Sequence, residues 1–193
     1  MNIPELFEQI ADRHRDAFDA SFKGESIDVL EKISREILKA FKSGKKVMLC
    51  GNGGSASDSQ HIAAEFVGRF KRERQSLPAI ALTTDTSILT AVANDYSYED
   101  IFSRQVEGLG AEGDILIGIS TSGNSGNVIK AVKVAKEKNI VTIAMTGGSG
   151  GKLAGECDLA FVAGSKLTPH IQEVHIAALH AVSEVVEDVF FGS

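Results

Sequence analysis

The chain has 193 residues, and its 20 Lys and Arg against 26 Asp and Glu give a formal charge of −6. This acidic balance, without a basic tail, argues against binding to a nucleic-acid backbone, which needs clustered basic side chains. Apolar runs too short for a membrane helix, an N-terminus without a signal-peptide core and two distant cysteines indicate a cytoplasmic protein. They argue against a membrane partner, a disulfide framework or a thiolate zinc site.

Two helices are expected before the first strand, over 3–22 and 26–43, because apolar residues recur there at helical spacing. In the second helix, Ser26 is placed to cap the start and Gly44 to close the end. We predict that the two helices form an N-terminal hairpin over 1–44.

Short apolar runs then alternate with helical stretches. The runs are rich in Val, Ile and Leu and do not alternate with polar residues, which is typical of strands buried on both faces. The expected strands are 46–50, 79–82, 114–119, 141–145 and 159–163. We predict one α/β domain over 1–193, whose core (45–193) has a five-stranded parallel sheet in a flavodoxin-like order, flanked by helices. A long helix over 169–190 ends the core.

Glycine accounts for 19 residues, and many of them gather directly after predicted strands. The three glycine-rich turns are GNGGSAS (51–57), STSGNSGN (120–127) and TGGSGG (146–151). In an open α/β sheet, ligands bind at the carboxyl ends of the strands. We therefore expect these turns to lie at one ligand-binding edge.

The first turn matches a variant of the dinucleotide fingerprint, G-x-G-x-x-A, through Gly51, Gly53 and Ala56. That fingerprint also needs an acidic residue about 20 positions on, and the nearest candidate, Asp85, lies farther away. A P-loop is excluded because no G-K-[ST] follows a glycine loop. We expect no nucleotide cofactor.

The turn after the third strand is suited to a phosphate group. It places four hydroxyls at a strand end and helix start, on Ser120, Thr121, Ser122 and Ser125. Hydroxyls and free N–H groups at a helix N-terminus can hold a phosphate monoester without lysine. The alternative is a serine-rich helix cap. The TGGSGG turn has fewer hydroxyls and indicates a structural crossover.

Two helices carry residues suited to proton transfer. His61 and Glu65 are four residues apart and share a helix face. A solvated pair would have the same spacing, but the apolar neighbours indicate a largely buried helix, where an unpaired Glu is costly. The last helix carries Gln172, His175 and His180 within an apolar pattern.

Gln172 and His180 are separated by about 12 Å and 80° on an ideal helix. Their long side chains could just reach a shared metal or substrate. A site at a subunit junction would ease that geometry, which is one indication of an oligomer.

The chain resembles the sugar isomerase (SIS) domain family, and within it the phosphoheptose isomerases. The resemblance covers nearly the whole chain and rests on CGNGGSASDSQHIAAEF (50–66), ANDY (93–96), GISTSGNSGNVIKA (118–131), TGGSGGKLA (146–154) and IQEVHIAALH (171–180). The serine-rich motif alone would mark only the domain. Glu65 and His180, together with Gln172 and His61, are specific to the isomerase.

This resemblance implies a role for each motif. The implied substrate contacts are Asn52, Gly53, Gly54, Ser55, Glu65, Asn94, Asp95 and Gln172, with Ser120, Thr121, Ser122 and Ser125 on the phosphate. Glu65 and His180 would be the acid/base pair. The implied zinc ligands are His61, Glu65, Gln172 and His180. The family implies a homotetramer with active sites between subunits, feeding heptose synthesis for bacterial lipopolysaccharide or capsule.

The implied reaction converts sedoheptulose 7-phosphate into D-glycero-D-manno-heptose 7-phosphate through an enediol. It needs a base for the carbon-bound proton and an acid for the carbonyl oxygen, each worth roughly 10²–10⁴ in rate. We assign Glu65 as base and His180 as acid, although the roles could be exchanged. Zinc bound to both would leave neither free to carry a proton. The metal would then shift or exchange a ligand, or act as a Lewis acid on the carbonyl.

The sequence has two alternative functions. A non-catalytic SIS protein could bind the replication initiator DnaA, and residues 69–95 also resemble such proteins. Those relatives lack the counterparts of Glu65 and His180, which this chain has. A SIS sensor regulating transcription would need a helix-turn-helix, which is not found here.

Two further features concern charge. Arg69, Lys71, Arg72 and Arg74 form a basic cluster that could steer an anionic substrate but is more simply a solvated helix end with a loop. His170 stands where relatives often have Arg, directly after Pro169 at an expected first helical position. An anion contact from that Arg is therefore not expected here.

Overall fold

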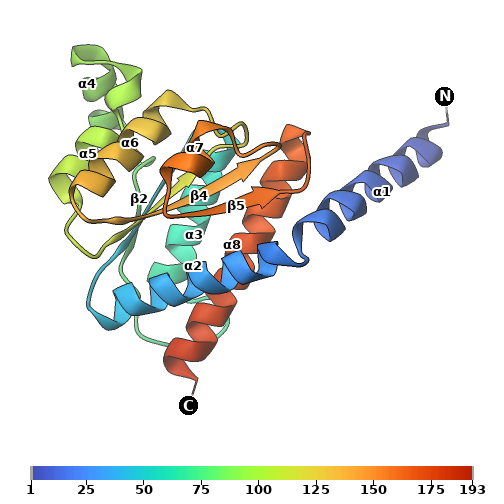
Figure 1. The fold of residues 1–193 in the computed structure, drawn as a ribbon, viewed down its shortest axis with the longest axis horizontal. Helices are drawn as coiled ribbons and strands as arrows, with labels where there is room; N and C mark the ends of the chain where they lie inside the picture. The colour runs from blue at the N-terminus through green and yellow to red at the C-terminus, as the bar shows by residue number, and fades with distance from the viewer. Residues whose placement is uncertain (1, 193) are drawn as a thin grey trace.

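A five-stranded parallel sheet forms the centre of the protein in a computed structural model that describes residues 2–192 (Figure 1). The strands are β1 (Val47–Gly51), β2 (Ala79–Ala81), β3 (Ile115–Ile119), β4 (Val141–Gly147) and β5 (Leu159–Ala163). Their spatial order is β2-β1-β3-β4-β5, which confirms the predicted flavodoxin-like topology. The order reverses between β1 and β3, so a binding crevice is expected at their carboxyl ends.

Helices flank both faces of this sheet. They are α1 (Ile3–Ser21), α2 (Glu25–Lys42), α3 (Gly54–Val67), α4 (Thr86–Asp95), α5 (Ser103–Leu109), α6 (Gly126–Glu137), α7 (Gly151–Glu156) and α8 (Thr168–Phe191), with a short 3-10 helix, η1 (Tyr98–Asp100). Pro169 is therefore the second residue of α8 rather than the first.

Two apolar cores separate the layers. Leu49 and Ile117 face a core shared with α2, α3 and α8, while Met48 and Leu116 face a core shared with α5, α6 and α7. Every residue of β1 and β3 is buried, as predicted for strands covered on both sides. The edge strand β2 is only partly buried.

The start of α2 differs from the prediction. The helix begins at Glu25, so Ser26 lies inside its first turn and Gly24, with φ 52°, precedes it. Glycine adopts this left-handed conformation without a Cβ penalty, which explains the early start. Gly44, with φ 68°, follows the end of the helix as predicted.

Helix α1 extends away from the sheet (Figure 1). It continues roughly in line with α2 instead of folding back on it, so the predicted N-terminal hairpin is wrong in this detail. Ala17 and Ser21 are buried near the end of α1, which contacts β5 and α8. Ile3 and Phe7 are 66% and 68% exposed. Much of the apolar face of α1 is therefore left exposed, with no other element of residues 2–192 packed on it.

Within residues 2–192, none of the helices combines the length and apolar character that a membrane crossing requires.

Candidate active site

The three glycine-rich turns follow β1, β3 and β4 at the carboxyl edge of the sheet, as predicted. The turn after β3 packs directly on the turn after β4, because a Cβ on Gly123 would lie 2.0 Å from the Gly150 carbonyl oxygen. Leu153 N donates to the Gly123 carbonyl at 2.9 Å. The TGGSGG turn therefore supports its neighbour, consistent with the crossover role predicted for it.

Four hydroxyl-bearing residues surround the start of α6. Ser120 is buried and its Oγ lies 2.8 Å from Ser125 Oγ, while Ser122 Oγ accepts a bond from Asn124 N at 3.2 Å. Ser125 occupies the N-cap position but its side chain makes no capping bond. Val128 N donates to Asn127 Oδ1 at 2.9 Å, whereas the N–H groups of Gly126 and Asn127 have no backbone partner within the helix, so hydroxyls and N–H donors meet here. This is the chemistry that a phosphate group requires.

Asn52 joins the turns after β1 and β3. Its amide pairs reciprocally with Asn127, with N···O distances of 2.9 and 2.8 Å. Tyr98 Oη also donates to Asn52 Oδ1 at 2.9 Å. Sequence reasoning missed Asn127 and Tyr98, because their contacts with Asn52 link distant parts of the chain. These bonds hold Asn52 in one orientation.

The start of α3 lies against Gln172. A Cβ on Gly54 would be 2.4 Å from Gln172 Nε2, so glycine permits this close approach. Gly53 is exposed with φ 56°, and Ser55 is buried. The residues that follow Asn52 thus form a turn against which the Gln172 side chain packs.

Helices α3 and α8 bring three predicted functional side chains together. His61 Nε2 lies 3.0 Å from Glu65 Oε1 and 3.2 Å from His180 Nε2. Glu65 and His180 are half-buried, whereas His61 is exposed. Burial and the neighbouring His61 lower the pKa of His180, and the Glu65 carboxylate opposes them. His61 and His180, which the resemblance implies as ligands of one zinc ion, therefore lie side by side within one chain, although 119 positions separate them.

Gln172 does not join this cluster. It packs beside Gly54, about two helical turns before His61 on α3, and about 12 Å along α8 from His180. The structure thus brings together three of the four predicted metal ligands. The fourth predicted ligand, Gln172, lies where the starts of α3 and α8 meet.

Asn94 and Asp95 lie apart from the histidine cluster. Both are exposed at the end of α4, and Asn94 Nδ2 donates to Asp95 Oδ1 at 2.8 Å. Helix α4 packs chiefly on η1 rather than on α3 or α8. Asp85, the weak dinucleotide candidate, accepts a bond from Ile88 N at 2.9 Å and caps α4.

One basic position differs from its sequence interpretation. The sequence predicts that Arg74 belongs to a solvated basic cluster, but its side chain is 2% exposed and pairs with Glu187. The signal for this pair was the position of Glu187 on α8, directly after Val186 and four residues after Ser183, on the buried face of the helix. His170 is buried, and its ring centroid lies 4.4 Å from that of His14.

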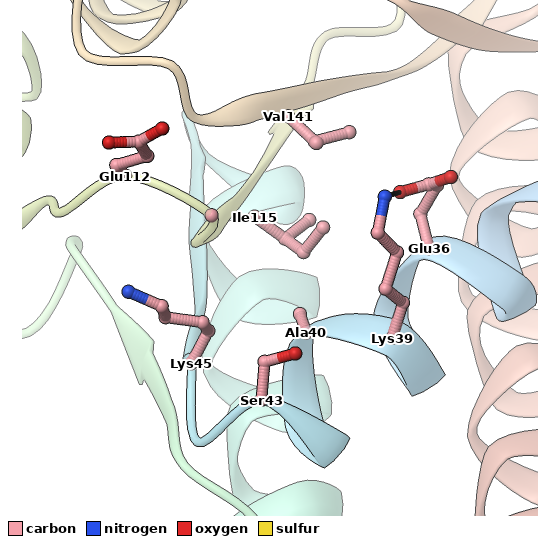
Figure 2. Close-up of a pocket in the computed structure, with 9 residues that line it drawn as sticks. Glu36, Lys39, Ala40, Ser43, Lys45, Glu112, Ile115 and Val141 are labelled. Carbon is pink, nitrogen blue, oxygen red and sulfur yellow. Dashed lines mark ion pairs between the residues drawn. The ribbon is translucent and has the colours of Figure 1, made fainter.

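A cavity of about 360 Å³ lies at the opposite edge of the sheet (Figure 2). It is bordered by the first residues of β3 and β4, Ile115 and Val141, and by the end of α2. Its charged side chains include Lys39 and Glu36, which pair at 3.7 Å. Because ligands of this fold bind at the carboxyl edge, the cavity does not belong to the candidate site.

Asp58 is a carboxylate that sequence reasoning passed over. It lies one turn before His61 on α3, at a spacing that already indicated a shared face. Its Oδ2 is buried, with no hydrogen-bond partner among the described residues. Burial raises its pKa to about 6, although the charge of His61 acts in the opposite direction.

We expect Asp58→Asn to stabilise the protein at pH 7 by about 1–2 kcal/mol, because it removes a partly buried, unpaired charge. A carboxyl whose pKa is raised on folding costs stability above that pKa and nothing below its unfolded value. The gain should therefore disappear by about pH 4. Urea unfolding of both proteins at the two pH values measures this, and a stabilisation unaffected by pH would contradict it.

His175 is fully buried on α8, and its Nε2 donates to the Thr146 carbonyl at 2.8 Å. Its Nδ1 has no partner among residues 2–192. Burial lowers the pKa of His175 to about 4, against the smaller effect of the Thr146 bond. Its place beneath the β4 turn indicates a structural role.

Acid should destabilise the protein through His175. A histidine whose pKa is lowered on folding contributes stability above about pH 6.5 that is lost as the pH falls toward 4. The loss is expected to reach roughly 3 kcal/mol at the low end of that range. His175→Gln can still donate to Thr146 but does not titrate, so its urea midpoint should fall less between pH 7 and pH 4.5. Equal falls in both proteins would contradict this assignment.

Comparisons with known proteins decide the family. The family model described as SIS domain matches residues 14–147. A phosphoheptose isomerase from Clostridium acetobutylicum is 54% identical over 169 residues, which cover 88% of this chain and 86% of that protein. One from Roseiflexus sp. is 57% identical over 159 residues, covering 82% and 81%.

The chain belongs to the phosphoheptose isomerase family of SIS-domain proteins. Membership makes it an isomerase, and these relatives give no support to the DnaA-binding alternative.

Solved structures of the family have the same fold. The phosphoheptose isomerase from Neisseria gonorrhoeae has a TM-score of 0.86 at 42% identity, covering 95% of this chain and 99% of that one. The enzyme from Francisella tularensis has a TM-score of 0.91 at 33% identity, covering 97% and 100%. The predicted SIS fold and family are thereby confirmed.

Proposed function

We propose that this chain interconverts sedoheptulose 7-phosphate and D-glycero-D-manno-heptose 7-phosphate in heptose synthesis for a bacterial lipopolysaccharide or capsule. The observation that carries the proposal is the convergence of His61, Glu65 and His180 in a member of the phosphoheptose isomerase family. Moving a proton between C1 and C2 requires an acid and a base in reach of the same substrate.

The chain's own residues divide the work. The hydroxyls and N–H groups around Ser120 and Ser125 hold the phosphate and fix one end of the open-chain sugar. Glu65 takes the carbon-bound proton, and His180 serves the carbonyl oxygen as acid. In the second half of the reaction Glu65 returns a proton to the neighbouring carbon, and His180 recovers its proton from the neighbouring hydroxyl. The reverse reaction uses the same two groups on the same kinds of atom. Asn52 is held ready for a sugar hydroxyl by Asn127.

The histidine cluster fits zinc. Its donor atoms are two imidazole nitrogens and a carboxylate oxygen, all within 4.8 Å of one another. Zinc binds such nitrogen and oxygen donors, and three protein ligands with an open position are typical of a catalytic site. His61, Glu65 and His180 would hold the ion. When bound, it would polarise the substrate carbonyl as a Lewis acid, and Glu65 and His180 would carry protons only when they are not bound to the ion.

We further propose a homotetramer with active sites at subunit interfaces. The Gln172 side chain lies beside Gly54 in the single chain, so it would have to turn toward the cluster, or a second copy would have to supply the residue. Beside His180, α8 carries an exposed stripe of Ala181, Val185 and Val189, the last two 46% and 54% exposed. A second copy of this chain is the occupant we propose, because the stripe adjoins the site that needs completing.

A cytoplasmic location is also proposed. Both cysteines, Cys50 and Cys157, are free thiols, which suits a reducing compartment.

The deciding experiment follows sedoheptulose 7-phosphate by NMR in deuterated water, with and without a chelator. We expect the aldose to appear and deuterium to enter at C2, and turnover to fall with the chelator and return with zinc. Sedoheptulose without its phosphate is the matched control and should react far more slowly. No conversion in any arm, with zinc added, would refute the isomerase proposal. Unchanged turnover after metal removal would refute the proposed role of zinc but not the isomerase activity.

A further inference from the structure

Arg74 and Glu187 form an ion pair buried between α3 and α8. Arg74 Nε lies 2.7 Å from Glu187 Oε1, and each side chain is 2% exposed. Burying two charges costs solvation that their attraction repays only partly, so such a pair is weak evidence for stability. The bonds around it indicate what else it does.

Glu187 holds the loop that follows α3. Its two carboxylate oxygens accept bonds from the backbone N–H groups of Phe70, Lys71 and Arg72, at 3.1, 2.8 and 3.0 Å. Together with Arg74, four donors therefore converge on one carboxylate. A carboxylate bonded in this way has little freedom to move, and these bonds keep its pKa low despite burial.

Arg74 holds the end of α3 itself. Its guanidinium donates to the carbonyl oxygens of Glu65 at 2.7 Å and Phe66 at 2.9 Å. The last carbonyls of a helix lack intrahelical partners, and a positive charge there complements the helix dipole. The carbonyl bonded at the shorter distance belongs to the residue proposed as base.

The same loop reaches the other proposed catalytic side chain. The Phe70 ring centroid lies 5.6 Å from that of His180, and Phe70 is half-buried. Since Phe70 N is bonded to Glu187, the loop position that sets this ring contact depends on the pair. The ion pair is thus connected to Glu65 by one bond and to His180 through one residue.

We propose that Arg74 and Glu187 are positioning residues that set the spacing and orientation of Glu65 and His180. The inference rests on the proposed function for its kinetic consequence, but its structural part is independent of it. Proton transfer depends steeply on geometry, and a displacement of about 1 Å can cost about 10²-fold in rate. A buried, fully bonded pair that grips both helices provides the required precision.

Two exposed pairs offer matched controls. Lys71 pairs with Glu184, and Arg72 Nη2 lies 2.9 Å from Asp188 Oδ1, so both join the same loop to the same helix. Their side chains are 42–56% exposed, and ion pairs this exposed to solvent contribute little to stability. Asp188→Asn therefore changes a loop-to-helix ion pair without touching the buried one.

The kinetic test compares Glu187→Gln and Arg74→Lys with Asp188→Asn, using sedoheptulose 7-phosphate. We expect kcat to fall about 10–100-fold in both Glu187→Gln and Arg74→Lys, with KM within about threefold. The reason is that the catalytic groups move while the phosphate-binding turn does not. Asp188→Asn should stay within about twofold. Far-UV circular dichroism shows which variants are folded, and either Glu187→Gln or Arg74→Lys is sufficient for the test if the other does not fold.

A second readout does not depend on activity. Diethylpyrocarbonate modifies accessible histidines, and peptide mass spectrometry gives the rate at each site. We expect His180 to react several-fold faster in Glu187→Gln than in the wild type, while His14 on α1 is unchanged. A variant that is only less stable, with wild-type kcat and His180 reactivity, would overturn the positioning role. If the wild type converts no substrate, the proposed function fails, and His180 reactivity still decides whether the pair positions this residue.

Discussion

Glu65→Gln and His180→Gln should each lower kcat by about 10²–10⁴-fold or more, because each removes one of the two groups that move protons. Gln resembles Glu in shape and can occupy the volume of His, so the fold should persist. The half-buried positions of both side chains keep the expected cost in stability small. The double variant should lose little more than the worse single one, since residues acting as a unit are not additive.

Steady-state kinetics with sedoheptulose 7-phosphate measure the effect, and thermal unfolding checks the fold. Glu184→Gln is the matched control, because it lies on the same helix as His180 and forms an exposed pair with Lys71. It should retain activity within about twofold. Full activity in either Glu65→Gln or His180→Gln would remove that residue from the mechanism.

Gly123→Ala should destabilise the protein by about 3 kcal/mol or more. Its φ of 64° is strained for any residue with a Cβ, and that Cβ would lie 2.0 Å from the Gly150 carbonyl oxygen. The clash is with backbone, so no side chain can rotate away. Relief requires the turns after β3 and β4 to separate, which would also displace the phosphate-binding hydroxyls. We therefore expect KM for the phosphosugar to rise together with the loss of stability.

Two other glycines separate strain from contact. Gly148 has φ 61° but nothing within 4 Å of an added Cβ, so Gly148→Ala should cost only about 1–2 kcal/mol. Gly155 lies in α7 with open space around it, and Gly155→Ala should be neutral or stabilising by up to about 1 kcal/mol. Urea unfolding of the three variants measures the series. A Gly123→Ala protein as stable as Gly148→Ala would show that the two turns are not in contact.

The local patterns in the sequence were sufficient for the main elements. Continuous runs such as those of β1 and β3 indicated strands covered on both faces, and the glycine-rich turns indicated the binding edge. The spacing of His61 and Glu65 gave their common helix face. Such features depend on neighbours within one or two turns, so they can be read without knowing the fold. The start of α2 was misplaced because the choice between Gly24 and Ser26 depends on a single backbone conformation.

The sequence by itself determined the fold class, the family resemblance and the residue types of the site. Only the tertiary structure decided that His180 meets His61, that Gln172 stays beside Gly54, and that Arg74 is buried against α8. The reason is physical: helical periodicity specifies which face of α3 or α8 is buried, but not which turn of one lies beside which turn of the other. That offset arises from side-chain packing across the whole interface. The offset between α3 and α8 brings residues that are distant in the sequence together in one site.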